Sequence, residues 1–154
     1  MKVEKIQYEI IKSYMKNEEK ARRTNVCYMK GDVFYITFDG VLIYKVDHKD
    51  FYLNSKVCDP SSAMINTISE LFNNSQYAFD LEFDHEAKLL NKKTGLLYLK
   101  KGEKEGNYFC IDKKLMKNFE NYTLKGTKPN NPIYVYEEDV LVGVVFPIHY
   151  NKRC

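Results

Sequence analysis

The chain of 154 residues lacks the features that mark membrane and secreted proteins. It contains no run of about 18 apolar residues, so no segment is long and apolar enough to cross a membrane as a helix. Its N-terminal segment is amphipathic and charged throughout, without the continuous apolar stretch of a signal peptide. These absences predict a cytoplasmic protein with no membrane partner.

Cysteine and glycine are sparse, at four and seven residues. The cysteines are at least 31 residues apart and form no C-x-x-C pair, which argues against a zinc site and a disulfide framework. Cys27 and Cys110 lie in strand patterns, where a buried inert thiol is expected rather than a nucleophile. The chain has no glycine-rich phosphate-binding motif and no G-x-S-x-G or H-E-x-x-H sequence. We therefore expect no cofactor, no metal, no catalytic residue and no enzymatic activity.

Length and composition favour one globular domain. Hydrophobic residues make up 44% of the chain and charged residues 29%, both ordinary values for a soluble fold. No linker or low-complexity stretch divides the sequence. We expect a single domain over residues 1–150 and a loose tail over residues 151–154.

Hydrophobic periodicity predicts three helices, at residues 3–21, 61–73 and 112–121. The second helix begins after a D-P-S-S sequence, and Asp112 could cap the third. The inward positions of the first helix are Val3, Ile6, Ile10, Tyr14 and Ala21.

The other apolar segments have the pattern of antiparallel strands, so the fold class is α+β. The D-G dipeptide at residues 39–40 predicts a hairpin. The segment 77–83 alternates so regularly that we expect its side with Tyr77, Phe79, Leu81 and Phe83 to be buried. Strands are predicted at 25–29, 33–38, 41–46, 77–83, 96–99, 108–111, 133–136 and 140–146, with a possible extension of the sheet at 51–53.

A weak internal repeat accompanies this pattern. Residues 34–46 and 134–146 align without gaps at an offset of 100, and each copy is an apolar strand, a turn with an aspartate and a second apolar strand. A helix with lysines on its outer face precedes each copy. The sequence thus predicts two units, each made of a helix and antiparallel strands.

Charge is unevenly distributed although the net charge is only +3. Residues 88–128 carry eleven lysines against four acidic residues, whereas residues 75–87 carry four acidic residues and no lysine or arginine. At about 100° per residue, the basic residues of the first helix lie within about 40° of one another and point away from the core. These residues are Lys5, Lys12, Lys16 and Arg23, and Lys113 and Lys117 are the outward lysines of the last helix.

The two-unit pattern resembles one domain of the DNA sliding clamps. The stretch YITFDGVL at residues 35–42 looks like the clamp strand that runs into a T-D-G turn, and PIYVY at 132–136 with LVGVVFPI at 141–148 looks like the clamp's closing hairpin. The resemblance covers about a third of the chain. It implies a clamp-like packing of the two units, with helices lining a hole and strands forming the rim.

The resemblance also implies a function. In the clamp family, helix lysines and arginines contact the DNA backbone without reading sequence, and such contacts give salt-sensitive, non-specific binding. The matching residues here are Lys5, Lys12, Lys16, Arg23, Lys113 and Lys117. We expect binding to duplex DNA or an accessory role beside replication or repair proteins, with a homo-oligomer supplying further domains. The residue usage suits a phage or bacterial source.

Two rival interpretations remain open. The first is a protein-interaction module without a DNA surface, whose partner would bind at strand edges or on the 61–73 helix. The second is a small enzyme built on carboxylates and histidine, in the Asp47-His48-Asp50 or Asp84-His85-Glu86 clusters, both of which we expect in exposed turns. His149 has no carboxylate nearby in sequence, and Tyr98, Tyr108 and Phe109 could stack on single-stranded bases but are expected in the core.

Overall fold

The computed structural model describes residues 1–24, 26–38, 40–51, 62–88, 95–102 and 108–148. The side chains of residues 23–29 and 61–64 are not placed. Helices and strands within the described residues are α1 (Val3–Lys16), α2 (Glu18–Thr24), β1 (Val26–Lys30), β2 (Val33–Thr37), β3 (Leu42–Asp47), η1 (His48–Asp50), α3 (Ser62–Asn73), η3 (Asn74–Tyr77), β4 (Phe79–Lys88), β5 (Gly95–Lys100), β6 (Tyr108–Asp112), η4 (Lys113–Met116), β7 (Tyr122–Gly126), β8 (Ile133–Glu137) and β9 (Val140–Val145).

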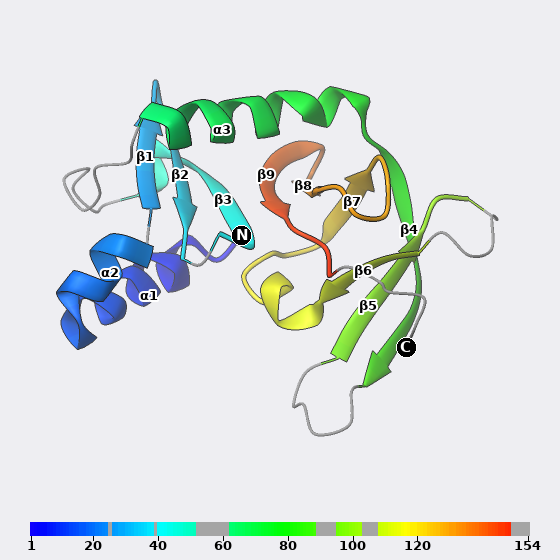
Figure 1. The fold of residues 1–154 in the computed structure, drawn as a ribbon, viewed down its shortest axis with the longest axis horizontal. Coiled ribbons are helices and arrows are strands. Elements are labelled where there is room, and N and C mark those ends of the chain that lie inside the picture. Colours follow the sequence, from blue (N-terminus) through cyan, green and yellow to red (C-terminus); the bar gives the residue numbers. More distant parts are fainter. Residues whose placement is uncertain (25, 39, 52–61, 89–94, 103–107, 149–154) are drawn as a thin grey trace.

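The strands confirm the α+β class. All strand pairs in the described part of the chain are antiparallel, and the nine strands found there form one sheet in the order β1-β2-β3-β9-β8-β7-β4-β5-β6. The first six strands of this order form two meanders, β1-β2-β3 and β7-β8-β9, which meet where β3 pairs with β9 (Figure 1).

The register between β3 and β9 has the symmetry of the sequence repeat. Ile43 pairs with Val144, and Tyr44 pairs with Gly143. Adding the offset of 100 turns Ile43 into Gly143 and Tyr44 into Val144, so each pair maps onto its neighbour. Every antiparallel ladder maps onto itself under one constant offset, but the pairing of the equivalent strands β3 and β9 is what a local two-fold axis between the two copies produces.

The last three strands of the order, β4-β5-β6, curl over the two meanders. Strand β4 pairs with β7 only from Phe79 to Leu81. From Glu82 onward it pairs with β5 instead. After β9 the chain reaches β6, where the backbone N–H of Ile148 donates to the carbonyl of Cys110 over 2.7 Å. The strands from β9 to β6 therefore form a small, incompletely closed barrel. Its interior is tight at Gly126, where a Cβ atom would lie 2.8 Å from Phe109.

Two hydrophobic clusters cover opposite faces of the meanders. On one face, Ile68 and Phe72 of α3 pack against β3, β8 and β9. On the other, α1, the curled strands β5 and β6, and the segment around η4 share the larger cluster, in which Ile6 and Ile10 are fully buried. Figure 1 shows α3 and α1 on opposite sides of the strands. No helix in the described residues is both long and apolar enough to cross a membrane.

The predicted helix 3–21 is divided in two. Asn17 has an extended backbone, and its side-chain oxygen accepts a hydrogen bond from the N–H of Lys20 over 3.0 Å. Asn17 thus ends α1 and caps α2, whose first turn holds Glu18 and Glu19. An asparagine followed by two acidic residues is a helix start signal that outweighed the continuous apolar periodicity.

The predicted helix 112–121 is wrong beyond its first turn. Asp112 does cap it, accepting from the N–H of Lys114, but η4 ends at Met116. Asn121 has a positive φ of 46°, and the chain then enters β7, a strand that the sequence pattern did not predict.

The predicted burial of one side of the 77–83 segment is also wrong. Tyr77, Phe79 and Phe83 are 64%, 52% and 59% exposed, because β4 lies where the sheet curls away from the main core. The strand runs on to Lys88, so the 84–86 cluster lies within β4 rather than in a turn. The expected extension at residues 52–53 and the tail at 151–154 lie outside the described residues.

Candidate nucleic-acid interface

The outer face of α1 carries the predicted basic residues. Because Ile6 and Ile10 face the core, the side chains on the opposite side of the helix point outward. Lys5, Lys12 and Lys16 are all exposed there, and none of the ion pairs among the described residues involves them. These three ammonium groups are therefore free to meet an anionic partner.

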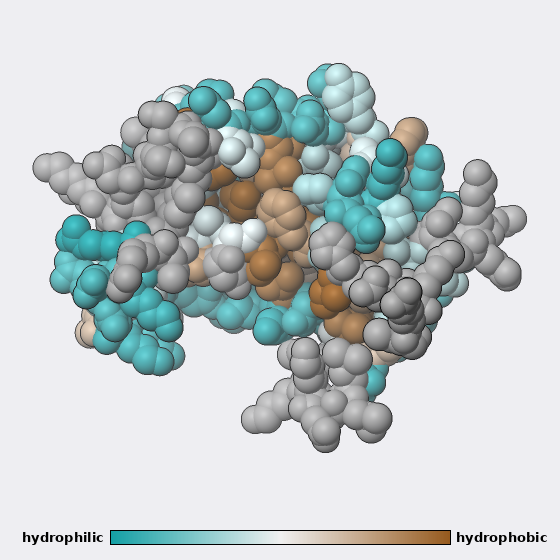
Figure 2. Space-filling view, in the orientation of Figure 1, coloured by the Kyte–Doolittle hydropathy of each residue, from teal (hydrophilic) through white to brown (hydrophobic). Residues whose placement is uncertain are grey.

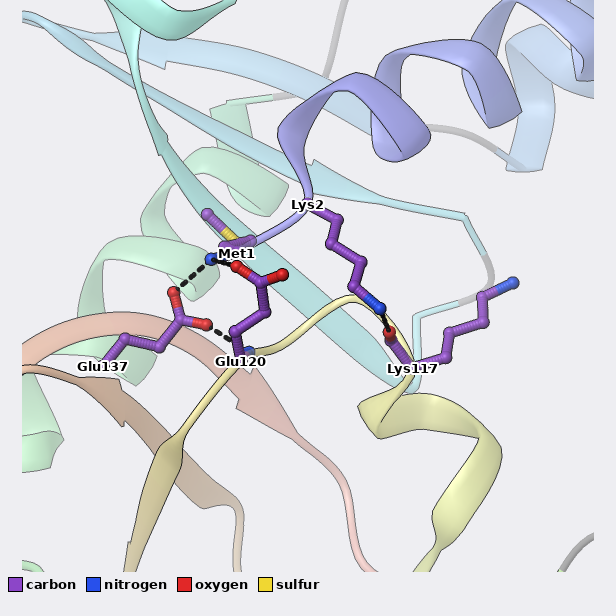
Figure 3. A network of polar contacts seen from close by, with 5 residues as sticks. All are labelled: Met1, Lys2, Lys117, Glu120 and Glu137. Carbon is purple, nitrogen blue, oxygen red and sulfur yellow. Dashed lines mark hydrogen bonds and ion pairs between the residues drawn. The ribbon is translucent and has the colours of Figure 1, made fainter.

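A polar network holds the start of α1 beside the segment that follows η4 (Figure 3). The N-terminal ammonium lies 2.6 Å from a carboxylate oxygen of Glu137 and 3.5 Å from one of Glu120. The backbone N–H of Lys2 donates to the carbonyl of Asn118 over 2.8 Å, and the Lys2 side chain reaches the carbonyl of Lys117. These contacts fix α1 and η4 next to each other on the same face of the sheet.

The lysines of η4 and the residue after it are less available than those of α1. Lys113 donates to both carboxylate oxygens of Glu86, over 3.1 and 3.0 Å, and Lys117 lies 2.7 Å from Glu9 of α1. Both side chains are exposed, but their charges are partly neutralised. Arg23 belongs to α2, and its side chain lies outside the described residues. The structure thus brings Lys5, Lys12 and Lys16 onto one helix face with Lys117 nearby.

An exposed apolar stripe lies next to these lysines on α1. Tyr8, Ile11 and Met15 follow the helical spacing, and Met15 is 82% exposed. At about 100° per residue, the centre of this stripe lies about 90° from the centre of the lysine face. In Figure 2 the visible side of α1 and α2 is mostly hydrophilic, while hydrophobic side chains gather in the middle of the molecule below α3. The apolar stripe was not predicted, although its spacing was readable in the sequence.

The first acidic-histidine cluster has a structural role. Asp47 caps the 3-10 turn η1 by accepting from the N–H of Lys49, and His48 stacks on Phe34 with ring centroids 5.6 Å apart. No group of three or more histidine, cysteine or acidic side chains in the described part of the chain is placed to hold a metal ion.

Asp84 and His85 of the second cluster form part of an aromatic surface on the outside of β4, β5 and β6, whereas Glu86 faces the other side of the sheet. His85 stacks on Tyr98 with ring centroids 4.6 Å apart and meets Tyr108 edge to face. Its Nδ1 atom lies 2.5 Å from the carboxylate of Asp84. This hydrogen bond, helped by Lys100 at 3.4 Å, holds the pKa of Asp84 below its ordinary value although desolvation opposes it. Contrary to expectation, Tyr98 and Tyr108 are only partly buried, whereas Phe109 lies in the core.

Of the two cysteines weighed as nucleophiles, Cys110 is buried in β6, and burial raises the pKa of its thiol. An inert thiol is the expected consequence. The side chain of Cys27 and the whole of Cys58, His149 and Cys154 lie outside the described residues.

A pocket of about 430 Å³ opens where β4 diverges from β7. Its walls include leucines of β4, β5 and β7, and its polar groups are the Glu86–Lys113 ion pair and the hydroxyl-bearing side chains of Tyr122 and Thr123. Burial raises the pKa of Tyr122, an effect that the neighbouring Lys113 opposes. Sequence reasoning missed this pocket, because its walls come together only when the sheet curls.

Comparison with protein-family models, curated proteins and solved structures found no match to this chain. The resemblance to sliding clamps therefore stays a prediction.

Proposed function

We propose that this protein is a non-enzymatic, clamp-like domain that binds duplex DNA weakly and without sequence preference through the outer face of α1, in the cytoplasm and beside replication or repair proteins. The observation that carries the proposal is the set of three exposed lysines, Lys5, Lys12 and Lys16, that share one helix face without an ion pair among the described residues. Lysine contacts to phosphates give affinity without distinguishing bases, which suits binding without sequence preference.

The arrangement of the two units adds support. The segments that precede the meanders, α1 and η4, lie on the same face of the sheet and are joined by the Lys117–Glu9 ion pair. A clamp-like domain also presents both of its helices on one face. Here the second helix is reduced to a single turn, so α1 supplies most of the basic surface.

The proposal is tested by fluorescence anisotropy with a labelled duplex of random sequence at several salt concentrations. Three phosphate contacts give a slope of about −2.7 for log K against log salt, and therefore a loss of affinity of about 40-fold between about 50 and 200 mM salt. The K12E/K16E variant should bind at least about tenfold more weakly at low salt. The matched control K88E/K128E makes the same change in net charge on β4 and on the β7–β8 turn, and should bind nearly as the parent does.

Absence of binding at about 50 mM salt would overturn the proposal. Equal losses in both double variants would show that binding depends on net charge rather than on α1. Light scattering on the same samples establishes whether a homo-oligomer is present, as a ring of such domains would require.

The exposed apolar stripe favours a second candidate, a protein-interaction module that uses α1. The helix α3, which sequence reasoning named as the alternative partner surface, exposes polar side chains at Asn66, Thr67, Glu70 and Asn73, whereas α1 exposes Tyr8, Ile11 and Met15. A row of exposed apolar side chains on a helix is typical of a surface that another protein covers.

The I11S/M15S variant separates the two candidates. It should abolish binding to a protein partner from the host and leave DNA binding and its salt dependence unchanged. If it weakens DNA binding as much as K12E/K16E does, the two candidate surfaces are not distinct.

A further inference from the structure

The pocket between β4 and β7 combines an apolar interior with one fixed charged group. At about 430 Å³ it falls within the range of small-molecule sites, which is about 300–1,000 Å³. Its apolar walls come from Leu81, Leu97, Leu99 and Leu124, while Phe83 lies at the edge and is 59% exposed. Such walls accept the hydrocarbon part of a ligand, and the charged group decides which polar end that ligand carries.

A β-bulge places Glu86 in this pocket. Phe83 pairs with Leu99 and Glu86 pairs with Leu97, so both face the same side of the sheet although they are three residues apart. In a regular strand, residues three apart face opposite sides, and the extra residue, Asp84, changes this. The bulge therefore turns a carboxylate toward the leucines.

The carboxylate of Glu86 is held against the backbone of β5. A Cβ atom at Gly95 would lie only 2.5 Å from Oε1 of Glu86 and 3.0 Å from its Cγ. Any other residue at position 95 would displace this side chain. The absence of a side chain at Gly95 therefore leaves room for the carboxylate in this position.

Lys113 already occupies the position of a cation on this carboxylate. Its ammonium donates to both oxygens of Glu86, but the lysine side chain is 54% exposed, against 30% for Glu86. Lys113 also belongs to a single 3-10 turn, and its ammonium lies at the end of a flexible four-carbon side chain. Of the two partners, the lysine is thus the one that can swing out into water.

We propose that this pocket binds a small organic amine, whose ammonium replaces that of Lys113 on Glu86 and whose apolar body lies against the four leucines. An anionic ligand would have to approach the fixed carboxylate and compete with it for Lys113. A neutral ligand would gain the apolar contacts but would form no ion pair. The proposal does not depend on DNA binding, because neither its ligand nor its test involves nucleic acid.

The test uses phenethylamine, with 2-phenylethanol and 3-phenylpropionate as neutral and anionic analogues of similar size, in isothermal titration calorimetry on the full chain. Phenethylamine should bind several-fold more tightly than the alcohol, because one hydrogen-bonded charge is worth at least about tenfold and the displacement of Lys113 from Glu86 takes up part of that gain. The carboxylate should bind most weakly. E86Q should remove the preference for the amine, since the amide keeps the size of the side chain without its charge.

The K113A variant should change the amine affinity in the opposite direction, because it lacks the Lys113 ammonium that competes for Glu86. It should bind phenethylamine more tightly than the parent, by several-fold to tenfold. G95A, which displaces Glu86 without changing any charge, should weaken amine binding. Urea unfolding establishes that each variant is folded, and K113A alone decides the matter if E86Q does not fold.

Three results would overturn the proposal: equal affinities for the amine and the alcohol, tighter binding of 3-phenylpropionate than of the amine, or weaker amine binding by K113A. The second result, or the third, would identify Lys113 rather than Glu86 as the charge that selects the ligand.

Discussion

A single buried hydrogen bond links the first meander to the segment that leads into the second. The side-chain amide of Asn118 donates to the hydroxyl oxygen of Tyr44 over 3.1 Å, and both residues are 1% exposed. Tyr44 lies in the middle of β3, and Asn118 lies between η4 and β7, where its carbonyl also accepts from Lys2 at the start of α1. This bond therefore helps to position α1 and η4 beside each other.

Replacing Tyr44 with phenylalanine removes the acceptor and keeps the ring, which packs on Phe119 with centroids 5.3 Å apart. Little packing is lost, so the cost comes from the lost polar contacts of the Tyr44 hydroxyl, among them the Asn118 amide, which stays buried without this partner. A buried polar group in that state costs about 1–3 kcal/mol of unfolding free energy. For a domain of this length, each kcal/mol lowers Tm by about 2–4 °C.

Urea denaturation of Y44F measures this cost, and Y136F is the matched control, because Tyr136 is partly exposed and its hydroxyl has no hydrogen bond among the described residues. The free energy of unfolding of Y136F should lie within about 0.5 kcal/mol of that of the parent. The double variant Y44F/N118L replaces both partners with apolar groups and should recover much of the loss. A Y44F variant as stable as the parent, or a double variant whose cost equals the sum of the single costs, would refute this account of the bond.

Three further changes test other parts of the fold. Gly126→Ala places a methyl group about 2.8 Å from Phe109, so it should cost about 1–3 kcal/mol in urea unfolding, and an unchanged midpoint would show that the barrel interior is looser than described. The lowered pKa of Asp84 means that its ionised form stabilises the fold above its ordinary pKa of 3.8 and that this contribution is lost as the pH falls below that value; D84N should therefore flatten the acid limb of the stability profile. The buried Cys110, with its raised pKa, should react with a thiol reagent only after unfolding, and mass-spectrometric mapping that finds it modified in the native protein would contradict its burial.

The sequence predicted those elements whose pattern is complete within a few residues. The stripe with Ile68 and Phe72 on α3 and the apolar hairpins at β2–β3 and β8–β9 are local patterns, and all of them are present. The sequence repeat also matches the sheet in that its two second strands, β3 and β9, pair with each other. Hydrophobic periodicity was sufficient where each element buries one face against the common core.

The errors arose where long-range packing or a cap decided the outcome. The alternation around Phe79 and Phe83 predicts a buried face for β4. Whether that face is buried depends on which other elements cover it after the sheet curls, and a local sequence pattern does not contain this information. Asn17 was readable in the sequence as a helix cap, but the prediction of one helix followed the apolar periodicity instead, and the structure follows the cap. Glu86 was named only as a member of the Asp84-His85-Glu86 cluster. Its place in the pocket was not predictable, because it depends on the bulge at Asp84 and on Gly95 in another strand.

Lys113 was predicted from the sequence as a DNA contact and also lies at the proposed amine pocket, so the two proposals can be tested together. At rest its ammonium is held by Glu86, and an amine in the pocket would release it toward the face of α1 and η4. One additional phosphate contact makes the slope of log K against log salt steeper by about 0.9. At any one salt concentration, the factor by which the amine raises the affinity for DNA must equal the factor by which duplex DNA raises the affinity for the amine. The salt series with and without phenethylamine measures this change in slope. The K113A variant should still bind the amine, but its slope should be the same with and without it. If the amine binds and the slope stays constant, Lys113 does not contact DNA, and the nucleic-acid surface is confined to the lysines of α1.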